Sequence, residues 1–390
     1  MVPAVARAIR ILRYLERQGP RGASLAQMHR ALTLNKSTCY GIVKTLTAAG
    51  FLDYTLLSRR YRLGEAILTL GRPIDRTRLQ EAFGVRVSPR RLRHRGWGGM
   101  IPERFEYFAP TTVAEAVGLL RTHGPDAKAV AGGHSLIPLM KLRLAAPRYL
   151  IDLNRIPGLA YIKETDDSLR VGAMSRHCDL ETSELIRTRY PLLADAARVI
   201  ADPLVRNMGT IGGSLAHADP ASDWGAAMLA AGATLVATGA RGERTIAIDD
   251  FIVDTFTSAL EPDEILTEIR IPRPAAHSGG AYVKLERKVG DFAIAAAGVR
   301  LVLDGRGRAE SVGIGLCNVA PTSLRAKRAE TVLRGQAPDD ATIGKAAQAA
   351  GEESDPASDL RGPADYKRDI VRVLTGRALR AALQRAKGGA

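Results

Sequence analysis

The chain has 390 residues, more than one compact core usually needs, with 46% hydrophobic and 25% charged residues, which is typical of a globular protein. Its three cysteines lie far apart, which excludes a disulfide framework and a Cys-x-x-Cys metal or iron–sulfur site, and its longest uncharged run, 224–240, is too short to span a membrane. Residues 1–99 hold 19 Lys and Arg against 5 Asp and Glu, so this segment carries 14 of the 15 net positive charges.

Residues 1–71 are predicted to form three short helices and a two-stranded wing. Ser24 and Asn35 are N-cap residues that begin the second and third helices, and Gly50 ends the third. The stretches 51–54 and 61–64 read as paired strands. The first helix has apolar residues at helical spacing with arginines between them, which also interrupt any secretory signal: Val5, Ile9, Leu12 and Leu15. The arrangement is a helix-turn-helix, and we expect a cytoplasmic location.

The third helix of such a module enters the major groove of DNA through its first turns. The candidate DNA-binding residues are Lys36, Ser37, Thr38, Tyr40 and Lys44, with Arg59 and Arg60 on the wing. The alternative is a solvated basic helix in a structural bundle.

Four motifs stand in the order found in one family of regulators: 7–12 (RAIRIL), 35–38 (NKST), 46–52 (LTAAGFL) and 61–64 (YRLG). Residues 4–71 therefore resemble the DNA-binding domain of the IclR family. Gly41 departs from the family, which often has a bulky basic residue there, and no effector-binding domain follows. The resemblance implies a DNA-binding module, for which we expect weak binding here.

Residues 72–99 are rich in arginine and glycine and show no sustained period, so they are predicted to be a linker. Met100 then begins the next domain. The sequence leaves open whether the fusion is functional or joins a regulator fragment to a neighbouring reading frame.

From residue 105 the pattern becomes α/β, with a helix at 111–123 and strands at 127–130 and 149–152. Between the strands, Gly132 and Gly133 precede a helix that starts at Leu136. Successive N–H groups at such a turn can hold a pyrophosphate, and glycine lets a ligand come close. A single Gly-Gly pair is more often an ordinary tight turn.

A second turn, Thr210 to Ser214, repeats the pattern of hydroxyl, apolar residue and paired glycine. Two such turns could hold one diphosphate from both sides. Neither a Gly-x-Gly-x-x-Gly fingerprint nor a P-loop competes with this interpretation. His134 and His217 lack the paired spacing of metal ligands, so no metal site is expected.

Three blocks, 131–143, 202–214 and 281–291, carry a second resemblance. Residues 102–385 resemble the medium, FAD-binding subunit of molybdenum hydroxylases, in particular aerobic carbon monoxide dehydrogenase, and the flavin domain of xanthine dehydrogenase. The resemblance implies a multidomain protein in which an α+β FAD-binding domain of two subdomains (PCMH-type, 100–276) precedes a C-terminal α+β domain of the CO dehydrogenase flavoprotein type (277–390). The local pattern agrees, with a hairpin at 293–319 and a terminal helix through 366–383.

The resemblance also implies which residues bind FAD. Those near the diphosphate are Ala129, Val130, Ala131, Gly132, Gly133, His134, Ser135, Leu136, Thr210, Ile211, Gly212, Gly213 and Ser214. Asp223 would contact a polar part of the cofactor, and Leu266 and Lys284 would lie near the flavin ring. Leu266 is equally interpretable as a core residue of a strand, and Ser214 replaces the usual asparagine.

The function implied is that of an oxidoreductase subunit. In the family, a molybdopterin large subunit hydroxylates the substrate, an iron–sulfur small subunit relays electrons, and FAD passes them to an acceptor. This chain would then work in a heterotrimer, itself able to dimerise, and would not act as a hydroxylase alone. The rival hypotheses are a transcriptional regulator with a flavin-type sensing or scaffold domain, and a flavin oxidase with its own substrate pocket. The sequence does not identify the substrate or the electron acceptor.

Overall fold

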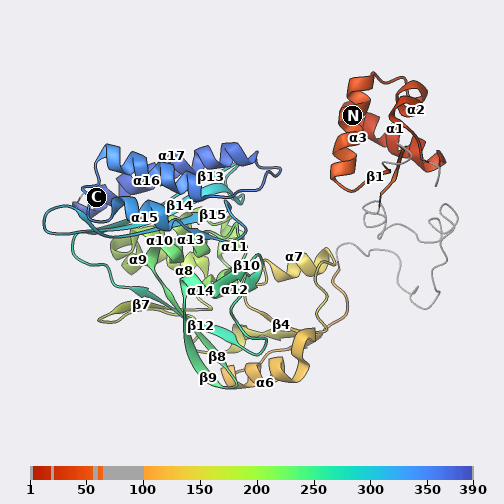
Figure 1. The fold of residues 1–390 in the computed structure, drawn as a ribbon. Coiled ribbons are helices and arrows are strands. Elements are labelled where there is room, and N and C mark those ends of the chain that lie inside the picture. Colours follow the sequence, from red (N-terminus) through yellow and green to blue (C-terminus); the bar gives the residue numbers. More distant parts are fainter. Residues whose placement is uncertain (1–2, 19–21, 56–59, 65–100, 389–390) are drawn as a thin grey trace. The chain divides into compact units, whose positions relative to one another are not determined.

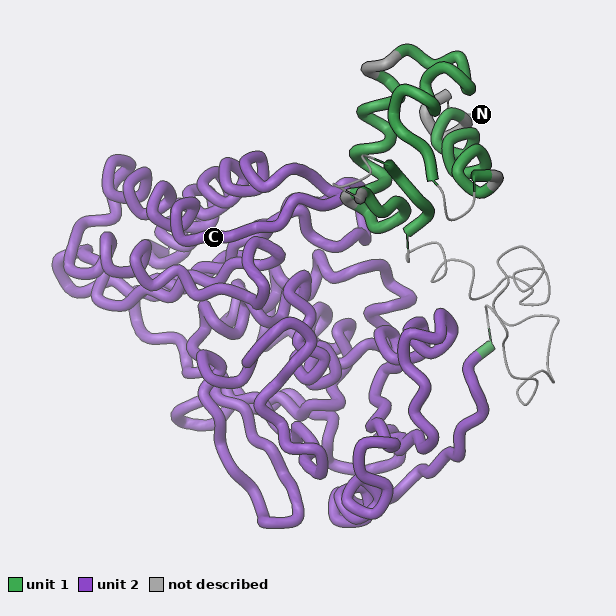
Figure 2. The backbone as a smooth tube through the Cα atoms, turned by 45° about the vertical axis from the view of Figure 1, so that its right-hand side comes forward, with its two compact units in different colours: residues 1–101 green, residues 102–390 purple. Residues whose placement is uncertain are grey.

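The computed structural model describes residues 3–18, 22–55, 60–64 and 101–388. The chain divides into two compact units, residues 1–101 and 102–390 (Figure 2). The predicted linker at 72–99 lies outside the described residues. Within the described parts of the chain, no helix combines the length and the apolar character needed to cross a membrane.

The first unit is the predicted helix-turn-helix with a wing. Its helices are α1 (Pro3–Gln18), α2 (Leu25–Ala31) and α3 (Lys36–Ala48), and its antiparallel strands are β1 (Leu52–Thr55) and β2 (Arg60–Leu63). The Ser24 hydroxyl accepts from the Gln27 N–H in a capping box, and Asn35 Oδ1 accepts from the Thr38 N–H at 2.7 Å. A small core of its own holds the unit together: Ile11, Leu15, Ala23, Met28, Leu34, Cys39, Val43 and Leu52.

The second unit begins with a parallel sheet in the order β3-β5-β4. Its strands are β3 (Glu106–Phe108), β4 (Ala127–Val130) and β5 (Tyr149–Asp152), and helices α6 (Val113–His123) and α7 (Leu136–Lys141) connect them. Parallel strands need such crossovers. The first glycine turn follows β4 directly, so the sheet presents it at the edge where the strands end.

An antiparallel sheet follows, in the order β6-β7-β12-β8-β9. Its strands are β6 (Ile162–Glu164), β7 (Ser168–Gly172), β8 (Thr234–Gly239), β9 (Gly242–Ala247) and β12 (Ile265–Pro272). A helical insertion separates β7 from β8 and contains α8 (His177–Thr182), α9 (Glu184–Arg189), α10 (Pro191–Val199), α11 (Pro203–Arg206), α12 (Ile211–His217) and α13 (Asp223–Ala231). The second glycine turn begins α12. Short elements α14 (Ile248–Phe251), β10 (Ile252–Asp254) and β11 (Thr257–Ser258) complete this part.

The C-terminal part is an antiparallel sheet in the order β13-β14-β15-β16. The strands are β13 (Ser278–Glu286), β14 (Ala293–Leu303), β15 (Ala309–Cys317) and β16 (Leu324–Arg325), so the predicted hairpin is confirmed. Helices α15 (Lys327–Leu333), α16 (Asp340–Glu353) and α17 (Ala364–Ala386) cover one face, and α10 and α13 lie on the other (Figure 1).

The backbone of helix α13 packs so closely against strand β15 that there is no room for side chains at two glycines of the strand. A Cβ added at Gly315 would stand 2.0 Å from the carbonyl oxygen of Ala226, and one added at Gly313 would stand 2.1 Å from that of Ala230. The same core contains Trp224 from α13 together with Tyr282 from β13. One cluster of buried side chains therefore extends from the helical insertion and the second sheet into the C-terminal part.

Candidate functional site

The two glycine turns lie against each other. A Cβ added at Gly132 would stand 2.2 Å from the carbonyl oxygen of Met208, just before the second turn, and one added at Gly213 would stand 3.5 Å from the Cβ of Ala131. A Cβ at Gly212 would meet Ala173 at 2.5 Å. At Gly132 and Gly212 the missing side chain is thus required by the close approach of protein backbones. The sequence pattern by itself attributes the same absence to room for a ligand.

The first turn presents a row of unused backbone donors. The N–H groups from Gly132 to Leu136 make no hydrogen bond to any residue in the described parts of the chain, whereas the carbonyls of Gly133 and Ser135 accept from the N–H groups of Ile137 and Leu139. Gly133 has a φ of +73°, a left-handed conformation that favours glycine. His134 and Ser135 are exposed, and the Ser135 side chain does not cap α7. Such a concave run of N–H groups is suited to an anion.

The second turn uses its donors within the protein. The N–H groups of Ile211 and Gly212 donate to the carbonyls of Ser175 and Ala173 at 3.1 and 2.9 Å, and those of Gly213 and Ser214 donate to the Thr210 hydroxyl and carbonyl at 3.0 Å each. The Ser214 hydroxyl lies 2.7 Å from that of Ser222. The N–H groups from Ile211 to Ser214 are therefore occupied, and the two turns are not equivalent.

Strand β4 delivers the first turn to this position. Val130, at the end of β4, is buried and anchors it, while the neighbouring Ala129 is exposed. Val130 is paired in register with Asp152 of the central strand β5. Of the predicted residues, Ala131 and Gly132 of the first segment therefore lie beside Gly213 of the second and beside Met208 and Gly209, which precede it.

Asp223 and Lys284 form a buried ion pair. The Lys284 Nζ donates to Asp223 Oδ2 at 2.9 Å and to the carbonyl of Val199 at 2.8 Å, and the Tyr282 hydroxyl donates to Asp223 Oδ1 at 2.9 Å. The two side chains are only 6% and 2% exposed. Burial raises the pKa of the Asp223 carboxyl above its usual range, although the Lys284 cation opposes this effect. The predicted site residues Asp223 and Lys284 are therefore neighbours, although they lie on different elements.

Leu266 lies within strand β12 and is buried in the same core as Leu215. It is paired with Ala237, next to an irregularity in the ladder between β12 and β8. Its position is that of the core residue named as its alternative interpretation.

Three residues beside the turns were not foreseen from the sequence. Arg176 donates to the carbonyl of Met208 and to Asn154 Oδ1, and Asn154 Nδ2 donates to the carbonyl of Ala131 at 2.9 Å. His177 is buried, and its Nδ1 accepts from Trp224 Nε1 at 3.0 Å, so the imidazole is neutral with its proton on Nε2. Burial, with smaller contributions from His134 and Arg176, lowers the pKa of His177 to about 4. No local motif marks these residues, because their partners are distant in the sequence.

The predicted DNA-binding residues begin helix α3. Tyr40 is 51% exposed, Lys44 is exposed and Thr38 is partly buried. The side chains of Lys36 and Ser37, and the whole of Arg59, lie outside the described residues. Arg60 donates to the carbonyl of Gly22 at 3.2 Å, which ties β2 to the segment before α2.

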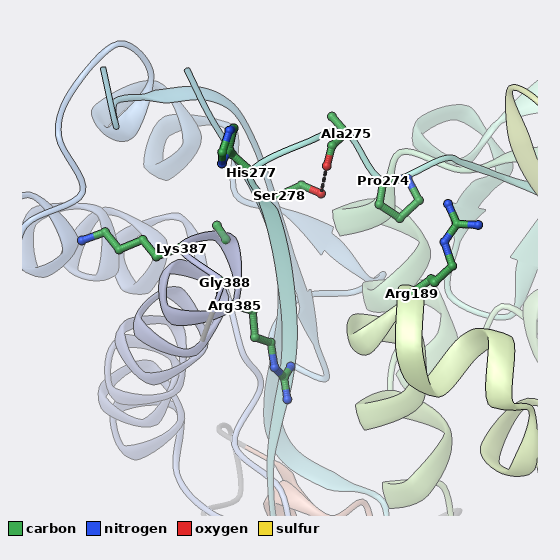
Figure 3. A pocket seen from close by; sticks show the side chains of 9 residues that line it. Arg189, Pro274, Ala275, His277, Ser278, Arg385, Lys387 and Gly388 are labelled. Atoms are coloured by element: carbon green, nitrogen blue, oxygen red, sulfur yellow. Dashed lines mark hydrogen bonds between the residues drawn. The ribbon is translucent and has the colours of Figure 1, made fainter. Parts of the chain in front are cut away.

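An open depression of about 470 Å³ lies elsewhere in the second unit and contains none of the predicted site residues. Its basic groups do not converge, since His277 and Lys387 point away from Arg189 (Figure 3). Arg385, also on its edge, is already bound to Asp195 and to the carbonyl of Gly280. The depression has no arrangement that would hold a ligand in a fixed orientation.

Three protein families match the chain. Residues 103–274 match the FAD binding domain in molybdopterin dehydrogenase, residues 280–382 match the CO dehydrogenase flavoprotein C-terminal domain, and residues 4–55 match the IclR helix-turn-helix domain. Both resemblances inferred from the sequence are therefore confirmed, as are the multidomain fold class and FAD as the cofactor.

Curated relatives cover the second unit almost end to end. The chain is 48% identical to the carbon monoxide dehydrogenase medium chain of Hydrogenophaga pseudoflava, over 73% of this chain and 99% of that one. It is 38% identical to the 6-hydroxypseudooxynicotine dehydrogenase complex subunit alpha of Paenarthrobacter nicotinovorans, over 74% and 97%. Among solved structures, carbon monoxide dehydrogenase from Hydrogenophaga pseudoflava superposes with a TM-score of 0.72 and 49% identity, over 73% of this chain and 99% of that chain.

Proposed function

We propose a function for this chain on the basis of its family: the chain belongs to the family of carbon monoxide dehydrogenase medium chains. In our proposal it is the electron-transfer subunit of a molybdenum hydroxylase complex. In this proposal an iron–sulfur small subunit gives electrons to FAD on this chain, and an external acceptor takes them away. A molybdopterin large subunit carries out the hydroxylation in the cytoplasm. The three isolated cysteines support a division of labour in which the metal centres are on other chains.

The row of unused N–H groups from Gly132 to Leu136 is the observation that carries the proposal. A diphosphate needs several donors at once, and these donors have no competing partner in the described chain. The second turn lies beside the first and carries the partly buried Ser214, whose hydroxyl is 2.7 Å from that of Ser222. Bound FAD supplies the reversible electron chemistry, and the chain supplies its position and its surroundings.

The proposed contacts follow from what each residue has available. The first turn and the adjoining strand end donate to or line the diphosphate: Ala129, Val130, Ala131, Gly132, Gly133, His134, Ser135 and Leu136. The second turn forms the facing wall through the partly buried Gly213 and Ser214, and the buried Thr210, Ile211 and Gly212 support it from behind. Asp223 and Lys284 already use their charged atoms on each other, so they support the site mainly by holding β13 to α13. Leu266 is 5% exposed and could reach the cofactor only through that small part of its surface.

A matched pair of substitutions at Ser135 tests the assignment. Its side chain is exposed and makes no capping hydrogen bond, so Ser135→Asn and Ser135→Asp should fold alike. They differ by one negative charge beside the proposed diphosphate. We expect the full chain to bind about one FAD and the Asn variant to resemble it. The Asp variant should bind FAD about tenfold or more weakly, because its carboxylate repels the negatively charged diphosphate.

FAD affinity is measured by fluorescence quenching during titration of the apoprotein, and the melting temperature of each variant is recorded in parallel. Equal FAD affinity of the Asp and Asn variants would show that the diphosphate lies elsewhere. A wild-type chain that shows no flavin absorbance and binds no added FAD would contradict the function itself.

The N-terminal unit favours a second, accessory function in DNA binding. The exposed Tyr40 and Lys44 on α3 and the excess of positive charge in residues 1–99 support it. The regulator hypothesis would make this activity primary and the flavin a sensor. We propose instead that electron transfer is primary, because the relatives with extensive coverage match the second unit.

A further inference from the structure

Two side chains, those of Arg176 and Asn154, join the two glycine turns. The guanidinium of Arg176 donates through one nitrogen to the carbonyl of Met208, which precedes the second turn. Its other terminal nitrogen donates to Asn154 Oδ1, and Asn154 Nδ2 donates to the carbonyl of Ala131 in the first turn at 2.9 Å. Both turns are thus tied to one planar cation.

The backbone of Arg176 is held in place by contacts with Asp179 and Thr210. Its N–H donates to Asp179 Oδ2 at 2.8 Å at the start of α8, and its backbone forms a β-bridge with Thr210. The next donor along the second turn, the N–H of Ile211, bonds to the carbonyl of Ser175 at 3.1 Å. The residue that carries the guanidinium is therefore already built into the second turn.

Asn154 is fixed from the opposite side. Its N–H donates to Asp152 Oδ1 at 2.9 Å, and the other oxygen of Asp152 accepts from the Tyr107 hydroxyl at 2.5 Å. Tyr107 and Asp152 belong to the neighbouring strands β3 and β5. The bridge from Arg176 thus ends on the parallel sheet that delivers the first turn.

Only carbonyl oxygens of the turns are used by this bridge. The N–H groups from Gly132 to Leu136 make no hydrogen bond within the described residues, so they remain available to the diphosphate of the proposed FAD site. From these contacts we infer that Arg176, acting through Asn154, is a positioning residue that holds the two turns at the separation which the FAD diphosphate requires. This inference rests on the proposed FAD site and adds to it the residues that set its geometry.

Arginine is suited to this role in a way that lysine is not. The guanidinium presents parallel donors in a rigid plane and can bind two acceptors in fixed directions. The lysine ammonium is a compact point charge without this fixed geometry. Arg176→Lys should therefore keep the charge and lose the connection. Arg155 supplies the matched control, because it is an exposed arginine near Asp152 with no hydrogen bond or ion pair to any residue in the described part of the second unit.

The experiment compares the full-length chain with Arg176→Lys, Arg176→Gln, Asn154→Ala, the double variant Arg176→Gln/Asn154→Ala, and Arg155→Gln. FAD affinity is measured by titration of the apoprotein. Deuterium exchange of the FAD-free chain is measured in peptides that cover 131–142 and 203–214, and melting temperatures are recorded. We expect both Arg176 variants and Asn154→Ala to bind FAD about tenfold or more weakly, which is the usual range for losing a charge-assisted hydrogen bond.

The double variant should be no weaker than Arg176→Gln alone, because both substitutions break the same bridge. Exchange should rise in both peptides of the bridge variants and stay unchanged in Arg155→Gln. An equal loss of affinity in Arg155→Gln and Arg176→Gln would overturn the inference in favour of a general charge effect.

The exchange data separate this inference from the proposed function. If the wild-type chain bound no FAD, the function would fail, while faster exchange in both peptides of Arg176→Lys alone would still support the bridge. Unchanged exchange in all bridge variants would overturn it. Should Arg176→Gln fail to fold, Arg176→Lys and Asn154→Ala are the smaller changes that carry the same readouts.

Discussion

Asp223 and Lys284 illustrate what a single buried contact does in this protein. Both side chains are almost fully buried, and each charge is stabilised by the other and by neighbouring groups. Glu286 Oε2, 3.5 Å from Lys284 Nζ, is a second anion beside the cation. Such a pair adds little net stability when complete, but removing one member leaves an uncompensated charge in the interior. The pair also links β13 to α13, so its loss acts on the join between two parts of the core.

We predict that Lys284→Met destabilises the chain by about 3–5 kcal/mol at neutral pH. In this variant burial still raises the pKa of Asp223, and the cation that opposed the rise is gone. The folded protein favours the protonated form of a carboxyl whose pKa is raised. The contribution of this carboxyl to the free energy of unfolding is therefore present at low pH and is lost as the pH rises through the raised pKa. The loss of unfolding free energy relative to wild type, measured in urea, should be smaller at about pH 5 than at about pH 8.

The control is the double variant Lys284→Met/Asp223→Asn, which removes the unpaired charge as well. It should recover a large part of the stability at the higher pH. If the single variant lost the same free energy at both pH values, Asp223 would not be the group responsible.

At the scale of elements, local signals predicted most of the structure. The caps at Ser24 and Asn35 and the turn at 304–307 depend on neighbours in the sequence, and the elements they bound were predicted with small shifts at the ends. The different roles of the two turns could not be predicted, because the donors of Ile211 and Gly212 are taken by residues 173 and 175. The Arg176 bridge was missed for the same reason, since Asn154 is 22 residues away. The two glycine patterns are alike in sequence, but in the structure carbonyl groups that are distant in the sequence accept hydrogen bonds from the N–H groups of the second turn.

Helix α3 gives the prediction that belongs to this scale. A Cβ at Gly41 would meet nothing within 4 Å, so a side chain is tolerated there and would also favour the helix by about 1 kcal/mol. We predict that the full chain binds DNA weakly, with little sequence preference and a steep loss of affinity with salt, because phosphate contacts dominate. Gly41→Arg should bind DNA more tightly than Gly41→Ala, which changes only the helix propensity.

Fluorescence anisotropy with a labelled duplex, at low and at physiological salt, measures these affinities. Nanomolar binding of one operator by the wild-type chain at physiological salt would reject the prediction and would favour the regulator hypothesis. Equal affinities of the Arg and Ala variants would show that this face of α3 does not approach DNA.

At the scale of the molecule, the activity of the isolated chain tests the proposed division of labour between subunits. Cys39 and Cys317 are buried, Cys178 is partly exposed, and no cluster of three or more metal-ligating side chains occurs in the described residues. We predict that the purified chain loaded with FAD shows at most weak reduction of artificial dyes and no hydroxylation. Co-expression with the genes that neighbour it should yield a complex containing iron and molybdenum, measured by co-purification and metal analysis. Oxidation of a molybdenum-hydroxylase substrate by the isolated chain would refute this.

The shared core of the second unit has a consequence for how this protein can change over evolutionary time. Trp224 and Tyr282 lie on opposite sides of the boundary between two family matches, at 274–280, and belong to one core. A recombination event at that boundary would bring together surfaces that had not been selected to interlock, such as Gly315 against the backbone of α13. The helix-turn-helix has a core made of its own residues, so it can be gained, lost or exchanged between genes without a compensating change elsewhere. We therefore expect the two halves of the second unit to be inherited together, whereas the helix-turn-helix is free to have a separate history.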